Sequence, residues 1–185
     1  MNLTSPEMIR AVTQKWNGDR DARGRPLVPG DILERMKLVT SEEAWGTCKR
    51  NGYSFQFAGD WMNLHPERVV VGRAVTCRWV PRRPDVHDAI DRQGEEDDRV
   101  GFQNSWVIDE LETNDLIVVD LFGKVFNGTF AGDNLATAIK SRSGTGMVID
   151  GGIRDTQRIL EMDEFNAFIR GVDPSAILDV SMVEI

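Results

Sequence analysis

The 185-residue chain contains only two histidines and two cysteines, which limits the chemistry that it can carry. A zinc site built from three histidines is excluded, and a serine–histidine or cysteine–histidine nucleophile would have to use His65 or His87. The cysteines, Cys48 and Cys77, stand far apart without a CxxC motif. We expect them to be reduced, packed thiols of a cytoplasmic protein rather than a disulfide or a metal site.

Long apolar runs and an excess of basic charge are also absent. No segment reaches the roughly 20 apolar residues that span a bilayer, and residues 1–15 lack the apolar core of a signal peptide. Lys and Arg number 22 against 30 Asp and Glu, so the formal net charge is −8. This acidity would repel nucleic-acid phosphates and anionic membranes, so we expect neither as a partner.

The N-terminal part is predicted to be helical. Pro6 precedes apolar residues at helical spacing, and a second helix is predicted over residues 31–38. Residues 17–30 are rich in Gly, Asp, Arg and Pro and predict a connector or flexible arm. We therefore divide the chain into N-terminal helices and connector over 1–39 and a main domain over 40–185.

Helix and strand patterns alternate in the main domain. Strands that alternate with helices of about ten residues predict an α/β fold with largely parallel pairing. We expect helices over 40–51, 101–112 and 132–142, a short helix from Asp155, and strands over 68–80, 115–120, 147–149 and 166–169.

An aromatic cluster interrupts this alternation at residues 53–64. Tyr53, Phe55, Phe57 and Trp61 crowd between two turn signals. Such a cluster is typical of a core or a subunit interface, and less often of a lid over a ligand.

A charged segment follows the first long strand. Residues 81–99 are broken by proline, so we predict a solvated loop, and their four adjacent acids lack the glycine-spaced pattern of a calcium loop. His87 stands between two aspartates that could help it to hold a metal, but a surface loop is the interpretation we favour. Arg82 and Arg83 could attract an acidic substrate, although exposed loop arginines are usually solvated.

The first informative turn is Gly128-Thr-Phe-Ala-Gly132-Asp133-Asn134-Leu135, which leads directly into a helix. Free backbone N–H groups and the helix dipole make such an N-terminus a site for carboxylate or phosphate. In the simpler alternative, Asp133 caps its own helix and glycine makes the turn.

The second informative turn is Asp150-Gly-Gly-Ile-Arg154-Asp155, again between an apolar strand and a helix. Arg154 offers a planar fork for a carboxylate or enolate oxygen, and Asp155 offers a hard oxygen for Mg²⁺ or Mn²⁺. In the simpler alternative, Asp155 is a helix cap and Arg154 its ion-pair partner. Ligands of open α/β sheets bind outside the carboxyl ends of strands, so both turns could face one crevice.

A methyltransferase or dinucleotide site does not fit these glycines. Gly144-Thr-Gly146 precedes a strand, whereas such a fingerprint needs its glycines after a strand, where a helix begins. Gly144 is instead predicted to end the preceding helix.

Taken together, the chain resembles the RraA-like family. The matching motifs are Gly132-Asp-Asn-Leu135 and Gly144-Thr-Gly-Met-Val-Ile-Asp-Gly-Gly-Ile-Arg-Asp155, with weaker likeness in Val71-Gly-Arg-Ala-Val-Thr76 and Asp115-Leu-Ile-Val-Val-Asp120. The family includes class II aldolases for 4-hydroxy-4-methyl-2-oxoglutarate and 4-carboxy-4-hydroxy-2-oxoadipate, and the regulator of ribonuclease activity A.

The resemblance implies a swivelling β/β/α domain with layered sheets and helices. It also implies a homotrimer or homohexamer with the active site at a subunit boundary. In the aldolases, a strand-rich segment that follows the position of Ile185 brings an acidic residue towards a neighbour's metal-bound water. The C-terminal part of the 40–185 unit is therefore expected to be short.

The resemblance further implies roles for individual residues. Arg154 would bind the oxo or enolate oxygen of a 2-oxo acid, and Asp155 would bind Mg²⁺ or Mn²⁺ directly. Asp133 would touch the water shell of the metal, so catalysis would depend on Arg154 and Asp133. The substrate carboxylate would be held by four successive backbone N–H groups, those of Gly132, Asp133, Asn134 and Leu135.

The implied function is a metal-dependent lyase that cleaves a 4-hydroxy-2-oxo acid and releases pyruvate. Oxaloacetate decarboxylation is expected as a side activity, because both reactions leave the same enolate. A Lewis-acid metal and an arginine stabilise that charge by several kcal/mol. Two alternatives stay open. One is a non-catalytic interaction protein of the ribonuclease-regulator type, and the other is a different metal-dependent reaction on a 2-oxo or sugar acid.

Overall fold

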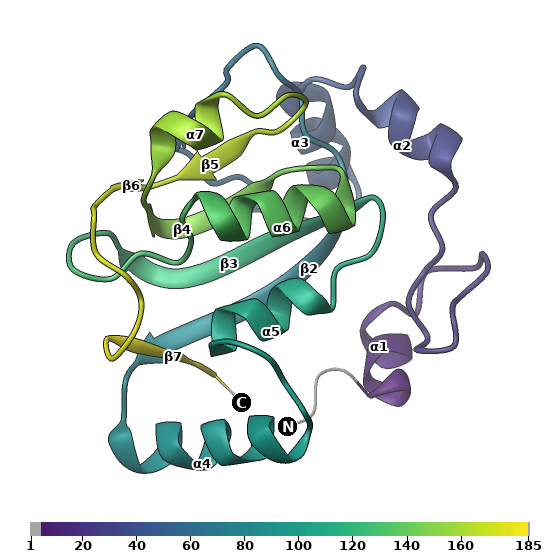
Figure 1. Cartoon of the computed structure of the whole chain (residues 1–185). Helices are drawn as coiled ribbons and strands as arrows, with labels where there is room; N and C mark the ends of the chain where they lie inside the picture. The colour runs from purple at the N-terminus through teal and green to yellow at the C-terminus, as the bar shows by residue number, and fades with distance from the viewer. Residues whose placement is uncertain (1–4, 185) are drawn as a thin grey trace.

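The computed structural model describes residues 5–184 as a mixed α/β fold built on a seven-stranded sheet (Figure 1). The sheet order is β1-β5-β4-β3-β2-β7, and β6 pairs with the end of β4. The helices are α1 (Pro6–Val12), α2 (Gly30–Met36), α3 (Ser41–Arg50), α4 (Pro84–Glu96), α5 (Gln103–Asp109), α6 (Asp133–Ser143) and α7 (Thr156–Leu160). The strands are β1 (Met62–Asn63), β2 (Arg73–Pro81), β3 (Asp115–Lys124), β4 (Met147–Ile153), β5 (Ala167–Ile169), β6 (Gly171–Val172) and β7 (Ser181–Val183).

The centre of the sheet is parallel, so the carboxyl ends of its strands share one edge. β2, β3, β4 and β5 pair in parallel, while β1 and β7 are antiparallel partners at the two sides. α4 and α5 connect β2 to β3, α6 connects β3 to β4, and α7 connects β4 to β5. The predicted α/β architecture and the helical N-terminal region are confirmed. The carboxyl edge is the place where such folds bind ligands.

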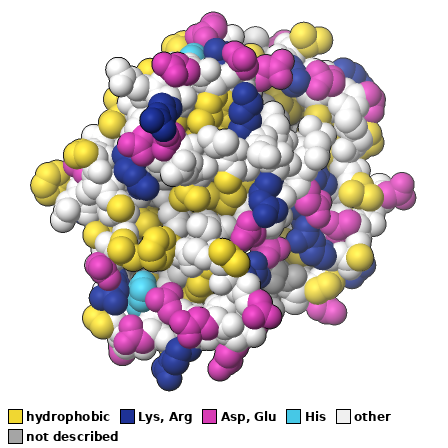
Figure 2. Space-filling model, in the orientation of Figure 1, with side chains coloured by type: hydrophobic (Ala, Val, Ile, Leu, Met, Phe, Trp, Pro, Cys, Tyr) yellow, Lys and Arg dark blue, Asp and Glu magenta, His cyan; other side chains and the backbone are white. Residues whose placement is uncertain are grey.

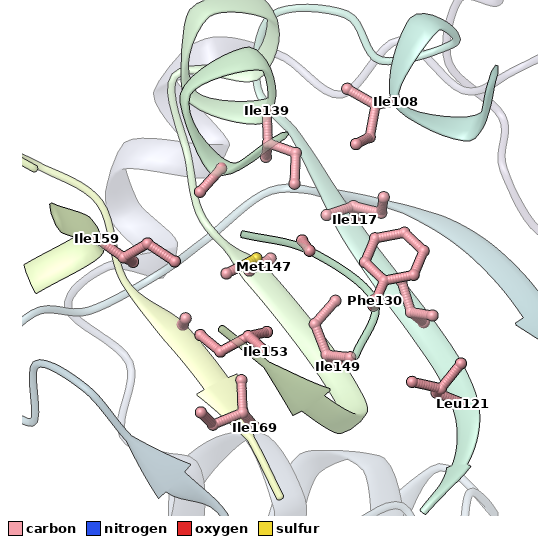
Figure 3. Close-up of a cluster of buried hydrophobic side chains, with 14 of the residues drawn as sticks. Ile108, Ile117, Leu121, Phe130, Ile139, Met147, Ile149, Ile153, Ile159 and Ile169 are labelled. Carbon is pink, nitrogen blue, oxygen red and sulfur yellow. The ribbon is translucent and has the colours of Figure 1, made fainter. Parts of the chain in front are cut away.

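The main hydrophobic core lies between the sheet and the helices α5 and α6 (Figure 3). Ile117 and Leu121 of β3 are fully buried, as expected for alternate residues on one face of a strand. Ile108 of α5 and Ile139 of α6 belong to the same cluster. Phe130 closes the core near the carboxyl edge and packs edge-to-face on Trp79, with ring centroids 5.8 Å apart.

Local end signals correctly predict several helix limits. α3 begins with a capping box, in which the Thr40 side chain accepts the Glu43 N–H and the Glu43 carboxylate accepts the Thr40 N–H. α6 ends at Gly144, whose φ of 69° lies in the left-handed region that glycine favours. These signals act within one helical turn, which is why the sequence is sufficient to find them.

The predicted loop over residues 81–99 is wrong, because most of it forms α4. Pro84 stands at the first turn of this helix, where proline has no N–H to lose and its fixed φ suits the helix. Ile90 and Gly94 give the helix a buried face. Gly94 lies against the Trp106 ring so closely that a Cβ atom would be 2.2 Å from it.

Two strands are longer than predicted, and one begins later. The Gly151-Gly152 pair, predicted as a turn, lies inside β4. A Cβ atom on Gly151 would be 2.7 Å from both Leu121 Cβ and the Lys124 carbonyl oxygen, so glycine serves close strand packing there. β3 continues to Lys124 through a shift in register, and β2 begins at Arg73 rather than residue 68.

The aromatic segment is not part of the core. Tyr53, Phe55 and Phe57 are 46%, 98% and 68% exposed, so the core interpretation is wrong for them. Trp61 is held in place by Arg170, whose guanidinium carbon lies 3.7 Å from the ring centroid. The subunit-interface and lid interpretations of this segment stay predictions.

Of the helices in the described part of the chain, none combines the length and apolarity that crossing a membrane requires. Both cysteines are free. Burial raises the pKa of the Cys77 thiol to about 12, so this thiol is protonated at neutral pH and unreactive.

The predicted connector over residues 17–30 is fastened to the main domain by arginine. Both Nη atoms of Arg25 donate to the Asp115 carboxylate, at 3.1 and 2.8 Å. Asp115 is fully buried, accepts the Glu112 N–H, and pairs with Arg73 at 3.0 Å. These contacts also raise the pKa of Arg25, chiefly through its hydrogen bonds to Asp115. The division into 1–39 and 40–185 stays a prediction.

Replacing Arg25 by Ala is expected to lower the free energy of unfolding by about 2–3 kcal/mol. Removing one partner of a buried ion pair leaves the other charge under-compensated, and Arg73 limits the loss. Arg23→Ala is the matched control, because the pairs of Arg23 with Glu110 and Glu112 are about 40% exposed and such pairs contribute under about 1 kcal/mol. Urea unfolding measures both variants, and equal losses would contradict the role given to Asp115.

Candidate active site

Backbone pairing brings the two predicted turns together at the carboxyl edge of the sheet. Ala131 and Ile153 form an isolated parallel bridge. The Phe130 N–H donates to the Gly152 carbonyl, and the Arg154 N–H donates to the Ala131 carbonyl, both at 2.9 Å. The N-terminus of α6 and the residues that follow β4 therefore lie side by side, as the sequence analysis expects.

Gly132 is in direct contact with the second turn. A Cβ atom on this residue would lie 2.2 Å from Asp155 Oδ2 and 3.0 Å from Arg154 Nε. A side chain at position 132 would therefore displace the carboxylate, the guanidinium or both. Glycine is required here for close approach, with an ordinary extended φ of −112°.

Asp155 stands at the N-cap position of α7 in a strained conformation. Its φ of 57° and ψ of 34° lie in the left-handed region, and its side chain makes no capping hydrogen bond. The alternative that makes Asp155 a helix cap is therefore correct for its position but not for its side chain. A non-glycine residue held in this region costs of order 1–3 kcal/mol, and such residues cluster at functional sites.

Arg154 lies between the carboxylate and a buried threonine. Its Nε is 3.4 Å from Asp155 Oδ2, so the predicted ion pair is present. Its Nη1 donates weakly to Thr129 Oγ1 at 3.4 Å, and the Thr129 hydroxyl donates to the Ser175 carbonyl. Thr129 is not among the residues that the sequence predicts for the site. The sequence signal that could have identified Thr129 is its position in the glycine-bearing turn before α6.

The N-terminus of α6 has no side-chain cap. Gly132 is the capping residue, so Asp133 stands at the first helical position and the alternative that makes it the cap is wrong. Asp133 Oδ1 accepts a hydrogen bond from the Asn134 N–H at 2.9 Å. The Asn134 N–H, which the sequence predicts to bind an anion, is therefore already bonded to a side chain. The first N–H groups of a helix lack partners within the helix. The side chain of Leu135 packs against the core, which anchors this turn.

Arg158 also lies at the candidate site, although the sequence did not predict it. Its Nη1 donates to Asp133 Oδ2 at 2.9 Å, and its own side chain is 77% exposed while that of Asp133 is 16% exposed. The pair joins α7 to the start of α6. No local signal could have found it, because 25 residues separate the two side chains in sequence.

The two carboxylates share an open depression that could accommodate a hydrated cation. Asp133 and Asp155 line it together with Thr156, Gln157 and Arg158. Within residues 5–184, no three His, Cys, Asp or Glu side chains gather as a metal cluster. This donor set fits Mg²⁺, which keeps several waters and is bound through one or two carboxylates, and it does not fit zinc. His87 lies outside this depression, on α4.

The sequence and the fold are similar to those of known proteins. A family model described as RraA-like, Aldolase/RraA, matches residues 43–182. Among solved structures, RraAS2 of Streptomyces coelicolor is described as an unusual member of the RNase ES inhibitor RraA protein family. It is 26% identical with a TM-score of 0.64, over 81% of this chain and 68% of that chain.

Two further structures share the fold at lower identity. One, described as novel cellulases from microbes associated with the gut ecosystem, is 20% identical with a TM-score of 0.68, over 100% of this chain and 74% of that chain. The other is an uncharacterized protein from Pseudomonas syringae pv. tomato. It is 18% identical with a TM-score of 0.61, over 86% of this chain and 67% of that chain. No curated protein matches the chain significantly. Because the family model spans most of the sequence, the chain belongs to the RraA-like family, which contains both aldolases and ribonuclease inhibitors.

Proposed function

We propose that this protein is a divalent-metal-dependent lyase that cleaves a 4-hydroxy-2-oxo acid and releases pyruvate. Oxaloacetate decarboxylation is the proposed side activity, because it leaves the same enolate. The observation that carries the proposal is the contact of Gly132 with Arg154 and Asp155. It brings a helix N-terminus, a guanidinium and a carboxylate with no capping role to one point.

Each group has a task that its chemistry suits. The N–H groups of Gly132, Asp133, Asn134 and Leu135 bind the substrate carboxylate, with the dipole of α6 adding attraction. For the substrate carboxylate to bind, the Asn134 N–H must release Asp133 Oδ1 and donate to the substrate instead. Arg154 binds the oxo oxygen and stabilises the negative charge that develops there as the C–C bond breaks.

Two carboxylates are proposed to hold the metal. Asp155 binds Mg²⁺ or Mn²⁺ directly, and Asp133 accepts hydrogen bonds from its water shell. When bound, the metal supplies Lewis-acid stabilisation of the enolate. Arg158 orients the Asp133 carboxylate beside the depression through their ion pair.

The assembly is proposed to be a homotrimer or homohexamer with this site at a subunit boundary. RraA-family proteins are typically oligomeric. The open form of the depression and the exposed aromatic side chains of residues 53–57 leave surface that a neighbouring subunit can cover. The proposed location is the cytoplasm, where Cys48 and Cys77 stay free.

The competing candidate is a non-catalytic interaction protein. The observation in its favour is the 26% identity to RraAS2, whose family is described by RNase ES inhibition. On the face that Figure 2 shows, Asp and Glu side chains are interspersed with Lys and Arg rather than gathered into an acidic patch. This pattern does not favour mimicry of a nucleic acid.

Metal removal tests the proposal. Pyruvate release, coupled to lactate dehydrogenase, would be measured with oxaloacetate and a panel of 4-hydroxy-2-oxo acids. We expect turnover with Mg²⁺ or Mn²⁺, loss of turnover with a chelator, and recovery when the metal is added back. Turnover that a chelator leaves unchanged would contradict the metal role, and an intact oligomer without turnover on any of these acids would favour the interaction protein.

A further inference from the structure

A second cavity lies where the end of β2, the start of α4 and β7 meet. Its volume is about 190 Å³. Its wall combines apolar side chains, among them Trp79, Phe102 and Leu178, with the polar side chains of Arg82, His87 and Ser181. None of the residues around the candidate active site lines it, so it requires its own explanation.

The wall of this cavity contains buried polar atoms that lack partners. Arg82 Nε, His87 Nδ1 and Ser181 Oγ make no hydrogen bond with any residue that the structure describes. Ser181 is only 4% exposed, so its hydroxyl cannot turn to bulk solvent. His87 Nδ1 lies 3.1 Å from Asp91 Oδ2 without hydrogen-bond alignment. An unsatisfied buried polar group costs about 1–3 kcal/mol, and a bound molecule would offset that cost.

The charges around the cavity select the kind of molecule. Arg82 Nη2 is 3.7 Å from Asp179 Oδ1 and 3.9 Å from Asp88 Oδ1, beyond hydrogen-bond distance, and Asp91 also lines the wall. An anion attracted by Arg82 would face three carboxylates. A cation attracted by the carboxylates would have no acceptor for the Arg82 N–H. A neutral molecule with several hydroxyl groups donates to the carboxylates and accepts from Arg82 at the same time.

The size and the apolar wall define the body of that molecule. A cavity of about 150 Å³ accommodates benzene, so about 190 Å³ admits one six-membered ring with substituents. Phe102 and Leu178 are 60% and 47% exposed and present an apolar surface beside the polar groups. We propose that this cavity binds a neutral polyhydroxylated ring of monosaccharide or cyclitol size, through hydrogen bonds to Arg82 and Ser181.

Ligand-observed NMR with saturation transfer tests the proposal on the full chain. D-glucose, D-xylose and myo-inositol are the neutral probes, with acetate, phosphate and methylammonium as charged probes. We expect binding of at least one neutral ring that oxalate does not displace, since oxalate resembles a pyruvate enolate and under the proposed function should bind at the candidate active site. Binding of charged probes alone, displacement by oxalate, or no neutral binding at millimolar concentrations would overturn the proposal.

Two substitutions locate the binding. We expect Arg82→Gln and Ser181→Ala each to lower the affinity for the neutral probe about tenfold, because each variant loses one hydrogen bond to it. Ser181→Ala breaks no bond within the described chain, so its melting temperature without ligand should not fall. The matched controls are Arg142→Gln and Ser141→Ala on the exposed face of α6. An unchanged affinity in both cavity variants, or an equal loss in the controls, would overturn the proposal.

Discussion

Asp155→Asn is expected to reduce metal-dependent pyruvate release by about a thousandfold while the protein stays folded. The amide keeps the size of the side chain but loses the charge that attracts a divalent cation. Lewis-acid stabilisation of an enolate is worth several kcal/mol, and each 1.36 kcal/mol is about tenfold in rate. The Asp155 side chain makes no capping hydrogen bond to α7, so the substitution should lower metal binding and activity without destabilising the helix.

The measurement combines the coupled assay with direct metal binding. Mn²⁺ titration followed by electron paramagnetic resonance should show weaker binding in Asp155→Asn than in the wild-type protein. Asp163→Asn is the matched control, because Asp163 is an exposed carboxylate in the turn after α7 and outside the depression. Unaltered Mn²⁺ affinity in Asp155→Asn would contradict the assignment of this residue as the metal ligand.

Arg154→Ala is expected to lower kcat by about a hundredfold to a thousandfold. Removing one preorganised donor to a developing oxyanion has an effect of this size in other enzymes. Arg154 is suited to that task because it is held in place on two sides, by Asp155 at 3.4 Å and Thr129 at 3.4 Å. Arg154→Lys keeps the charge but loses the planar fork, so we expect an intermediate rate.

Steady-state kinetics with the best substrate of the panel measures this effect. Oxalate, which has the shape and charge of a pyruvate enolate, should inhibit the wild-type protein and inhibit Arg154→Ala much less. Arg142→Ala serves as the control, since Arg142 lies at the C-terminal end of α6, away from the candidate site, and pairs with Asp109 of α5. A rise in KM with unchanged kcat would mean that Arg154 only binds substrate and does not stabilise the transition state.

The two turns of the candidate site could be located in the sequence because local signals mark them, and the family resemblance suggested the roles of their residues. Gly132 and Asp133 begin a helix after a glycine-bearing turn, and Arg154 and Asp155 follow an apolar strand. The strand-and-helix alternation places both turns at the carboxyl edge of one parallel sheet. These inferences need only residues that lie within a turn or two of one another.

Segments with two plausible local structures could not be assigned in this way. Residues 84–96 carry proline and many charges, which suit a loop as well as an exposed helix. In the folded chain the helix α4 is favoured because it buries Ile90 and Gly94. The Gly151-Gly152 pair suits a turn as well as a strand. In the folded chain, the close packing of Gly151 against Leu121 and Lys124 favours the strand.

The resemblance to the RraA-like family selected Gly132, Asp133, Arg154 and Asp155 as candidate site residues. Local sequence signals were sufficient for the α/β class and for most helix ends. They act through backbone conformation and hydrogen bonds between near neighbours. The contact of Gly132 with Asp155 and the ion pair of Asp133 with Arg158 arose only in the folded chain. The reason is that each depends on where two segments about 20 residues apart meet, and core packing rather than local propensity sets that position.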